Sequence, residues 1–148
     1  LRAAVSRGLE VISHRGNEGI IREMIERPAS VVPDELAKSP HPLVFVPVDE
    51  HLVLEDSMQR LDIYHAVGHF HMSDAVIAYL PNEKLVFQGD LVNRPANNDP
   101  PTINDTTVHF VNWLGKSGLN VERVIGVHGP PSTFDELRQA VASRGKGN

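Results

Sequence analysis

The densest group of residues able to bind a metal lies at residues 68–74, where His69 and His71 stand two positions apart. Neutral imidazole is the commonest protein ligand for metal ions. If the strand predicted over residues 60–67 continues, His65, His69 and His71 lie on one face of it. The alternative is a set of surface histidines at a strand end, because His-x-His is a short pattern that recurs by chance.

Two further residues follow predicted strands. Asp90 ends a Gln-Gly-Asp sequence, and its two carboxylate oxygens could each bind a cation. His128 lies between Gly126 and Gly129, which allow a tight turn and close backbone approach. An Asx turn at Asp90 and an ordinary turn histidine at His128 are the alternatives. Because loops at one sheet edge are where sites are built, the segments together indicate a metal site.

The elements that must position these residues are short strands and helices. Apolar runs rich in β-branched residues predict strands over residues 9–13, 43–48, 52–55, 60–67, 75–80, 84–88 and 121–127. The strands at 75–80 and 84–88 flank a Pro-Asn-Glu turn, so they should form a hairpin.

Helical spacing and capping residues predict helices over residues 1–7, 17–26, 105–116 and from 132 to about 143. Asn104 or Asp105 should cap the third, and Ser132 or Thr133 the fourth. Proline-containing stretches at 29–42 and 92–103 are predicted loops. The order predicts one α/β domain of the α+β type over residues 1–148, with a mostly antiparallel sheet covered by helices.

Composition narrows the function classes. A hydrophobic share of 41% and a charged share of 22% indicate a globular chain rather than a disordered one. The net charge of −5 argues against nucleic-acid binding, and the short apolar runs argue against a membrane span. The absence of cysteine excludes disulfides, thiolate zinc ligands and a cysteine nucleophile, and leaves the compartment open.

His71, the run Val-Ile-Ala-Tyr-Leu-Pro81, Gly89-Asp90 and Gly126-Val-His128-Gly129 together resemble the metallo-β-lactamase superfamily. In that family the ligand histidine stands ten residues before the hairpin proline, which selects His71 over His69. The resemblance covers residues 43–141 well and extends plausibly over 1–28. It implies a partial αββα sandwich that binds one or two zinc-type ions through His71, Asp90 and His128, with Asp90 bridging the metals and serving catalysis.

The defining His-x-His-x-Asp-His motif of that family is absent. Residues 1–13 look like the segment that follows it, so we expect the C-terminal portion of the fold, or a naturally shortened relative. Each metal would then keep one histidine and the shared Asp90, whereas zinc sites use at least three protein ligands. The resemblance therefore implies a hydrolase fold with an incomplete metal site.

Three functions remain open. The first is a metallo-hydrolase, or a fragment of one, acting on a small ester, lactone, thioester, amide or phosphoester. The second is an inactive truncated module that dimerises through its exposed face. The third is metal-free acid–base catalysis, which ranks last because no serine occupies a nucleophile elbow. Ser73 and Asp74 are candidate substrate or supporting contacts, and Arg94 is the one basic residue of the 92–103 loop.

Overall fold

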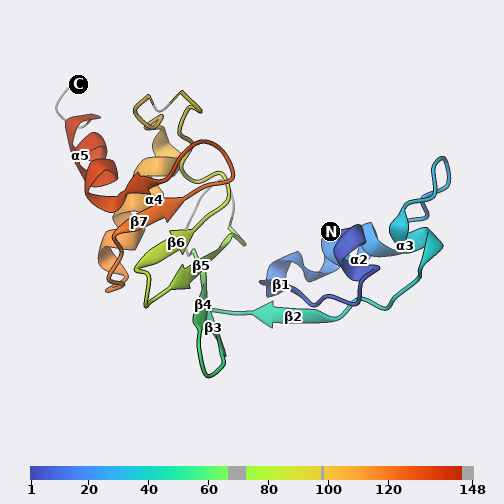
Figure 1. Cartoon of the computed structure of the whole chain (residues 1–148). Coiled ribbons are helices and arrows are strands. Elements are labelled where there is room, and N and C mark those ends of the chain that lie inside the picture. The colour runs from blue at the N-terminus through green and yellow to red at the C-terminus, as the bar shows by residue number, and fades with distance from the viewer. Residues whose placement is uncertain (67–72, 98, 145–148) are drawn as a thin grey trace. The chain divides into compact units, whose positions relative to one another are not determined.

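The computed structural model describes residues 1–66, 73–97 and 99–144, and its contacts group into two units, Leu1–Asp49 and Glu50–Asn148 (Figure 1). Within this described part, no helix combines the length and the apolar character needed to cross a lipid bilayer.

The first unit places short helices beside a two-stranded parallel sheet. Its elements in chain order are α1 (Arg2–Val5), β1 (Val11–His14), the 3-10 helix η1 (Arg15–Asn17), α2 (Glu18–Glu26), α3 (Glu35–Lys38) and β2 (Phe45–Val48). Val11 pairs with Phe45 in the parallel register. Val5, Ile21 and Leu36 form its core with Val11. The two helices and two strands predicted for this unit are present in the predicted order, with starts one or two residues later than expected. Gly8 has a φ of 70° three residues after the end of α1, as expected of a helix stop.

Helix α3 lies inside the stretch predicted as a loop. Asp34 follows Pro33 and accepts a hydrogen bond from the Ala37 amide at 2.9 Å, which caps the helix at its N-terminus. The helix has four residues, too few to show helical periodicity in the sequence. Pro33 and Pro40 therefore flank one turn of helix and do not exclude it.

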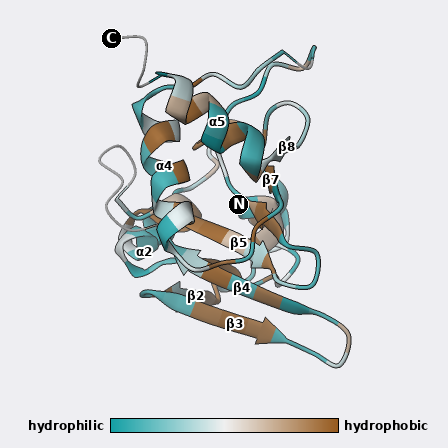
Figure 2. Cartoon of the chain, turned by 90° about the vertical axis from the view of Figure 1, so that its left-hand side faces the viewer, coloured by the Kyte–Doolittle hydropathy of each residue, from teal (hydrophilic) through white to brown (hydrophobic). Residues whose placement is uncertain are grey.

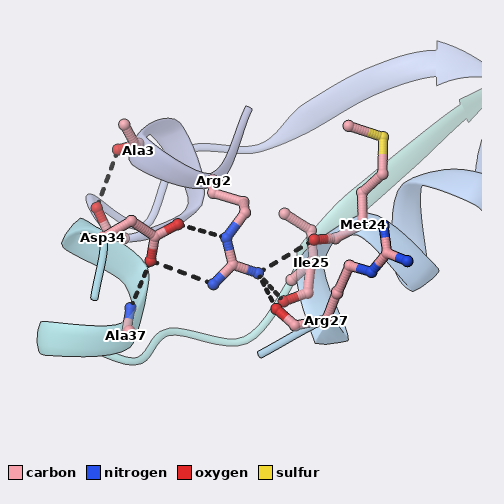
Figure 3. A network of polar contacts seen from close by, with 8 residues as sticks. Arg2, Ala3, Met24, Ile25, Arg27, Asp34 and Ala37 are labelled. Atoms are coloured by element: carbon pink, nitrogen blue, oxygen red, sulfur yellow. Dashed lines mark hydrogen bonds and ion pairs between the residues drawn. The ribbon is translucent and has the colours of Figure 1, made fainter. Parts of the chain in front are cut away.

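One guanidinium joins three helices of this unit (Figure 3). Arg2 donates to both carboxylate oxygens of Asp34, the residue that caps α3. It also donates to three carbonyl oxygens at the C-terminal end of α2, those of Met24, Ile25 and Arg27. These carbonyls have no partner within the helix itself, so Arg2 satisfies them. The hydrogen bonds from Arg2 lower the pKa of Asp34 from 3.8 to about 2.

The second unit is built on a six-stranded sheet. Its strands, in spatial and chain order alike, are β3 (His51–Glu55), β4 (Arg60–His65), β5 (Val76–Leu80), β6 (Leu85–Phe87), β7 (Arg123–Ile125) and β8 (Ser132–Thr133). All neighbours pair antiparallel except β6 and β7, which pair parallel. The predicted hairpin is confirmed as β5 and β6, and the sheet is mostly antiparallel as expected.

Two helices cover this sheet, α4 (Asp105–Lys116) and α5 (Phe134–Arg144). Asn104 caps α4 by accepting the Thr107 amide at 2.9 Å, and Thr133 accepts the Glu136 amide at 3.1 Å at the start of α5. Both caps were among the residues expected from the sequence. Helix α4 lies in the crossover from β6 to β7, which is why these two strands can run parallel.

The sheet has two different faces. The register places Tyr79, Val86 and Val124 side by side in one row, and all three belong to the core formed with Phe110, Leu114 and Leu137 of the helices. The opposite face of the sheet is also apolar. One row of paired residues on that face consists of Leu52, Ile63, Ala78, Phe87 and Ile125. Figure 2 shows the apolar colouring of β3, β4 and β5.

Candidate metal site

Asp90 is presented by a turn that closes around a buried glutamine. Gln88 is 5% exposed, and its Oε1 accepts the Leu91 and Val92 amides at 2.7 and 3.1 Å. Its Nε2 donates to the Val92 carbonyl at 3.0 Å. One side chain thus supplies the hydrogen bonds that this turn needs after β6 ends. Asp90 lies within the turn, with its side chain 58% exposed.

The segment after β7 packs directly against that turn. A Cβ atom at Gly126 would lie 2.6 Å from Gln88 Nε2 and 2.9 Å from the Val92 carbonyl oxygen, so a larger residue does not fit without displacement. The Val127 amide donates to the Gly89 carbonyl at 3.3 Å. Glycine is therefore required at position 126 by the close approach of the two loops.

The structure brings Asp90 and His128 together. Because β6 and β7 run parallel, their carboxyl ends meet at the same edge of the sheet, and each residue follows one of those ends (Figure 1). His128 Nε2 lies 3.4 Å from Asp90 Oδ1, and the His128 side chain is 69% exposed. Both side chains are therefore accessible from solvent, as an ion or a substrate would require.

The third predicted ligand, His71, lies outside the described residues, as does His69. The described residues on either side of that segment are His65, at the end of β4, and Ser73 and Asp74, before β5. His65 Nε2 lies 2.6 Å from the Ser73 carbonyl oxygen, and Ser73 Oγ donates to Asp74 at 3.3 Å. The two strands that flank the His71 segment are thus joined at its base.

Asp90 and His128 fit a metal ion by type and by spacing. Zinc bonds to imidazole nitrogen and carboxylate oxygen are roughly 2.0–2.2 Å long, which in a tetrahedral site puts two ligand atoms about 3.4 Å apart. The Nε2–Oδ1 separation of 3.4 Å matches this spacing and is long for a hydrogen bond. The pair supplies two ligands, so a third protein ligand is needed to complete a zinc site.

Sequence reasoning missed the residues that support the pair. The sequence predicts Gln88 as the last residue of a strand, whereas in the structure its side chain bonds the turn that follows. The sequence shows Arg94 as the one basic residue of its loop and does not indicate its partners. In the structure its Nη1 donates to Glu136 at 2.8 Å and to Ser132 at 3.2 Å. No local pattern indicates that bond, because Glu136 lies 42 positions further along the chain.

Comparison with solved structures identifies the fold. The chain is similar to a metallo-β-lactamase from Pontibacter korlensis, with 20% identity and a TM-score of 0.60 over 95% of this chain and 60% of that one. An archaeal metallo-β-lactamase superfamily protein from Sulfolobus tokodaii gives 14% identity and a TM-score of 0.58 over 95% and 60%. The flavodiiron protein from Giardia intestinalis gives 13% and 0.58 over 95% and 36%.

The chain therefore has the fold of metallo-β-lactamase superfamily structures, as the motifs implied. It spans about 60% of the length of the first of these relatives. No protein-family model matches the chain, and no curated protein matches it by sequence. At these identities the likeness establishes the fold, and the chemistry must be argued from the site.

Proposed function

We propose that the chain carries part of the metal centre of a metallo-hydrolase, with His71, Asp90 and His128 as ligands of a divalent ion of the zinc type. The observation that supports this most directly is the 3.4 Å separation of His128 Nε2 and Asp90 Oδ1 at one edge of the sheet. The fold of the structural neighbours supports it independently.

A bound zinc-type ion would supply Lewis acidity and lower the pKa of a bound water toward about 7. In this proposal His128 donates its Nε2 lone pair as a ligand, and Asp90 offers one or both carboxylate oxygens. Because both side chains are more than half exposed, a substrate can reach them without displacement of the core. The chain would hold the remaining ligand at His71.

The substrate class proposed is a small ester, lactone, thioester, amide or phosphoester. The loop at residues 92–103 follows Asp90 and is placed to shape the approach to it. Its one basic residue, Arg94, is 11% exposed and bonded to Glu136. The guanidinium is thus committed to the protein, and this loop offers no other cation to bind a substrate phosphate.

Calorimetric titration of zinc into the metal-free chain tests the proposal. We expect binding in the micromolar range or tighter, and its loss in His71→Ala and in His128→Ala. His41→Ala is the matched control, because His41 lies in the first unit and contacts only the Ser39 carbonyl among the bonds described for it. Absence of zinc binding by the unsubstituted chain, or equal loss in all three variants, would contradict the proposal.

A second function, association of an inactive module with a second copy, is favoured by the outer face of the sheet. The apolar row of Leu52, Ile63, Ala78, Phe87 and Ile125 lies opposite the helix-covered face. Ile63 is already buried, whereas Phe87 is 41% exposed, so the β6 part of the row is the part open to a second copy. Apolar sheet faces are ordinarily buried against another layer. Such a face on a second copy would provide that layer.

Light scattering across a concentration series tests this association. Leu54→Lys puts a charge on the apolar face, whereas Val53→Lys puts the same charge on the opposite face of the same strand. The two positions are similarly exposed, at 36% and 40%. A dimer that dissociates only in Leu54→Lys supports association through this face. A monomer at all concentrations argues against it.

A further inference from the structure

The loop that carries His128 is in contact with Arg94 through its backbone. Gly129 has a φ of 75°, and a Cβ atom there would lie 1.9 Å from the Arg94 carbonyl oxygen and 2.7 Å from its carbonyl carbon. These separations leave no room for a side chain. Gly129, the residue directly after His128, is therefore in close backbone contact with Arg94.

The Arg94 side chain holds the same loop from its other end. Nη1 donates to Ser132 Oγ in β8 at 3.2 Å and to Glu136 Oε2 in the first turn of α5 at 2.8 Å. The Arg94 side chain is 11% exposed and that of Glu136 is 38% exposed, so solvent screens this ion pair less than it screens a fully exposed pair. One residue thus contacts the backbone at 129 and the side chains at 132 and 136.

On the N-terminal side of His128, the loop is fixed by a different residue. Gly126 packs against Gln88, and the Val127 amide bonds to the Gly89 carbonyl. Gln88 and Arg94 both belong to the segment that contains Asp90. The loop of His128 is therefore attached to the segment of Asp90 at two points, one on each side of the histidine.

We infer that Arg94 is a positioning residue, which sets the distance between His128 and Asp90 by holding the segment 129–136 against its own backbone. This inference rests on the proposed metal site for its consequence, although the contacts themselves do not. His128 is 69% exposed, so contacts of its own side chain do little to fix it. Its place is set by the loop.

The consequence for metal binding follows from the precision that a site needs. Ligand atoms must be held within about 0.5 Å of the productive geometry. Loss of the groups that orient a ligand typically lowers metal affinity 10- to 100-fold. Without the Arg94 side chain, β8 keeps its pairing with β7. Toward the segment of Asp90, however, residues 129–136 lose both side-chain bonds and keep the backbone contact at Gly129. His128 then samples a wider range of distances from Asp90.

Two measurements on Arg94→Ala test the inference, zinc affinity by calorimetry and hydrogen exchange of residues 126–131 without metal. We expect zinc affinity to fall about 10- to 100-fold and exchange of the Val127 amide to accelerate, because its bond to Gly89 depends on the loop position. Arg94→Lys keeps the charge opposite Glu136 and should restore a large part of both. Arg144→Ala is the control.

Arg144 is matched to Arg94 because it also forms a 2.8 Å ion pair between elements, with Asp105, but away from the two loops. Its removal should leave exchange at 126–131 and zinc affinity unchanged. Glu136→Gln keeps an acceptor for Arg94 and provides a milder variant if Arg94→Ala does not fold. In that case, Glu136→Gln should show a smaller change of the same sign.

The outcomes separate this inference from the proposed function. If the unsubstituted chain does not bind zinc, the proposed function fails, and exchange at residues 126–131 decides the inference alone. If zinc binds and Arg94→Ala binds it equally well, the inference is overturned while the metal site stands. Equal effects of Arg94→Ala and Arg144→Ala would also overturn it, because they would show a general loss of stability.

Discussion

Two of the histidine–aspartate pairs in the described part of the second unit differ in the distance between their atoms and in their exposure to solvent. His51 Nε2 lies 2.7 Å from Asp62 Oδ1, and the Asp62 side chain is 3% exposed. His128 Nε2 lies 3.4 Å from Asp90 Oδ1, and the Asp90 side chain is 58% exposed. The same two residue types therefore form a closed structural contact in one place and an open pair in the other.

The closed pair is completed by its neighbours on the sheet. Arg60 donates to both oxygens of Asp62 at 2.8 and 2.9 Å, and the ring of His51 stacks on Tyr64 with centroids 4.2 Å apart. The hydrogen bonds from Arg60, and to a smaller degree that from His51, lower the pKa of Asp62 despite its burial. These three contacts use three of the roughly four acceptor sites of the carboxylate.

The difference separates a buried structural carboxylate from an exposed one that we propose as a metal ligand. A structural carboxylate is buried and surrounded by donors that hold it at hydrogen-bond distance. The carboxylate that we propose as a ligand, Asp90, is exposed and lies in a turn that Gln88 holds through the amides of Leu91 and Val92. Histidine content alone does not separate the two, because both pairs contain one.

The largest expected effect concerns zinc affinity. Asp90→Asn removes the anionic ligand that we propose, so it should weaken zinc binding by at least about 100-fold, the upper end of the cost of disturbing a ligand's support. Asp62→Asn should leave the affinity within about threefold, because Asp62 contacts Arg60 and His51 instead. Calorimetry on both folded variants measures the contrast. Equal weakening would show that the two pairs do not have separate roles.

The next effect is on the free energy of unfolding, and here Asp62 matters more than Asp90. Asp62→Asn should lower the free energy of unfolding by about 1–3 kcal/mol, because it weakens charge-assisted bonds to a buried group. Asp90→Asn should stay within about 0.5 kcal/mol, as is usual for exposed positions. Urea unfolding of the metal-free proteins measures both. A larger loss for Asp90→Asn would reverse the comparison.

Acid sensitivity sharpens the assignment of Asp62. Since its pKa in the folded protein lies below the ordinary 3.8, the folded state binds fewer protons than the unfolded chain between these two values. The stability it contributes is present above 3.8 and is lost as the pH falls through the folded-state pKa. Arg60→Gln removes the main cause, so unfolding free energy should depend less steeply on pH below 4. A slope identical to that of the unsubstituted chain would exclude this role for Arg60.

The smallest effect is expected at His51. His51→Gln preserves a donor for Asp62 and loses the stacked ring on Tyr64, which should cost about 0.5–1 kcal/mol. Zinc affinity should not change. Thermal unfolding measures the loss of stability, and calorimetric titration measures the zinc affinity. A lower zinc affinity of His51→Gln would place this histidine in the metal site.

The parts of the molecule that follow local patterns were predictable. Asn104 as a helix cap and the hairpin at Pro81 depend on neighbours within a few residues, and both are present. Glycines at strand ends drew attention to Asp90 and His128. The contact of His51 with Asp62 was not predicted, because it depends on the register of β3 against β4, which opposes His51 to Tyr64.

The parts that depend on long-range contacts were not predictable. Arg94 and Glu136 meet only because β8 and α5 return to the sheet beside the loop of Asp90. The parallel pairing of β1 with β2 similarly joins segments separated by two helices. Helix α3 was not predicted because a helix of four residues is too short to show helical periodicity, and its capping residue Asp34 alone does not indicate a helix.

The parallel pairing of β6 with β7 has a consequence for the thermodynamics of the site. Positions 90 and 128 are 38 residues apart, and helix α4 lies between them. An ion bound to both would join the two ends of this segment in the folded state, and the unfolded chain would lack the site because it does not hold the two residues together. Each tenfold excess of free metal over its dissociation constant would then stabilise the second unit by about 1.4 kcal/mol. The supply of metal would in this way set the free energy of unfolding of the unit.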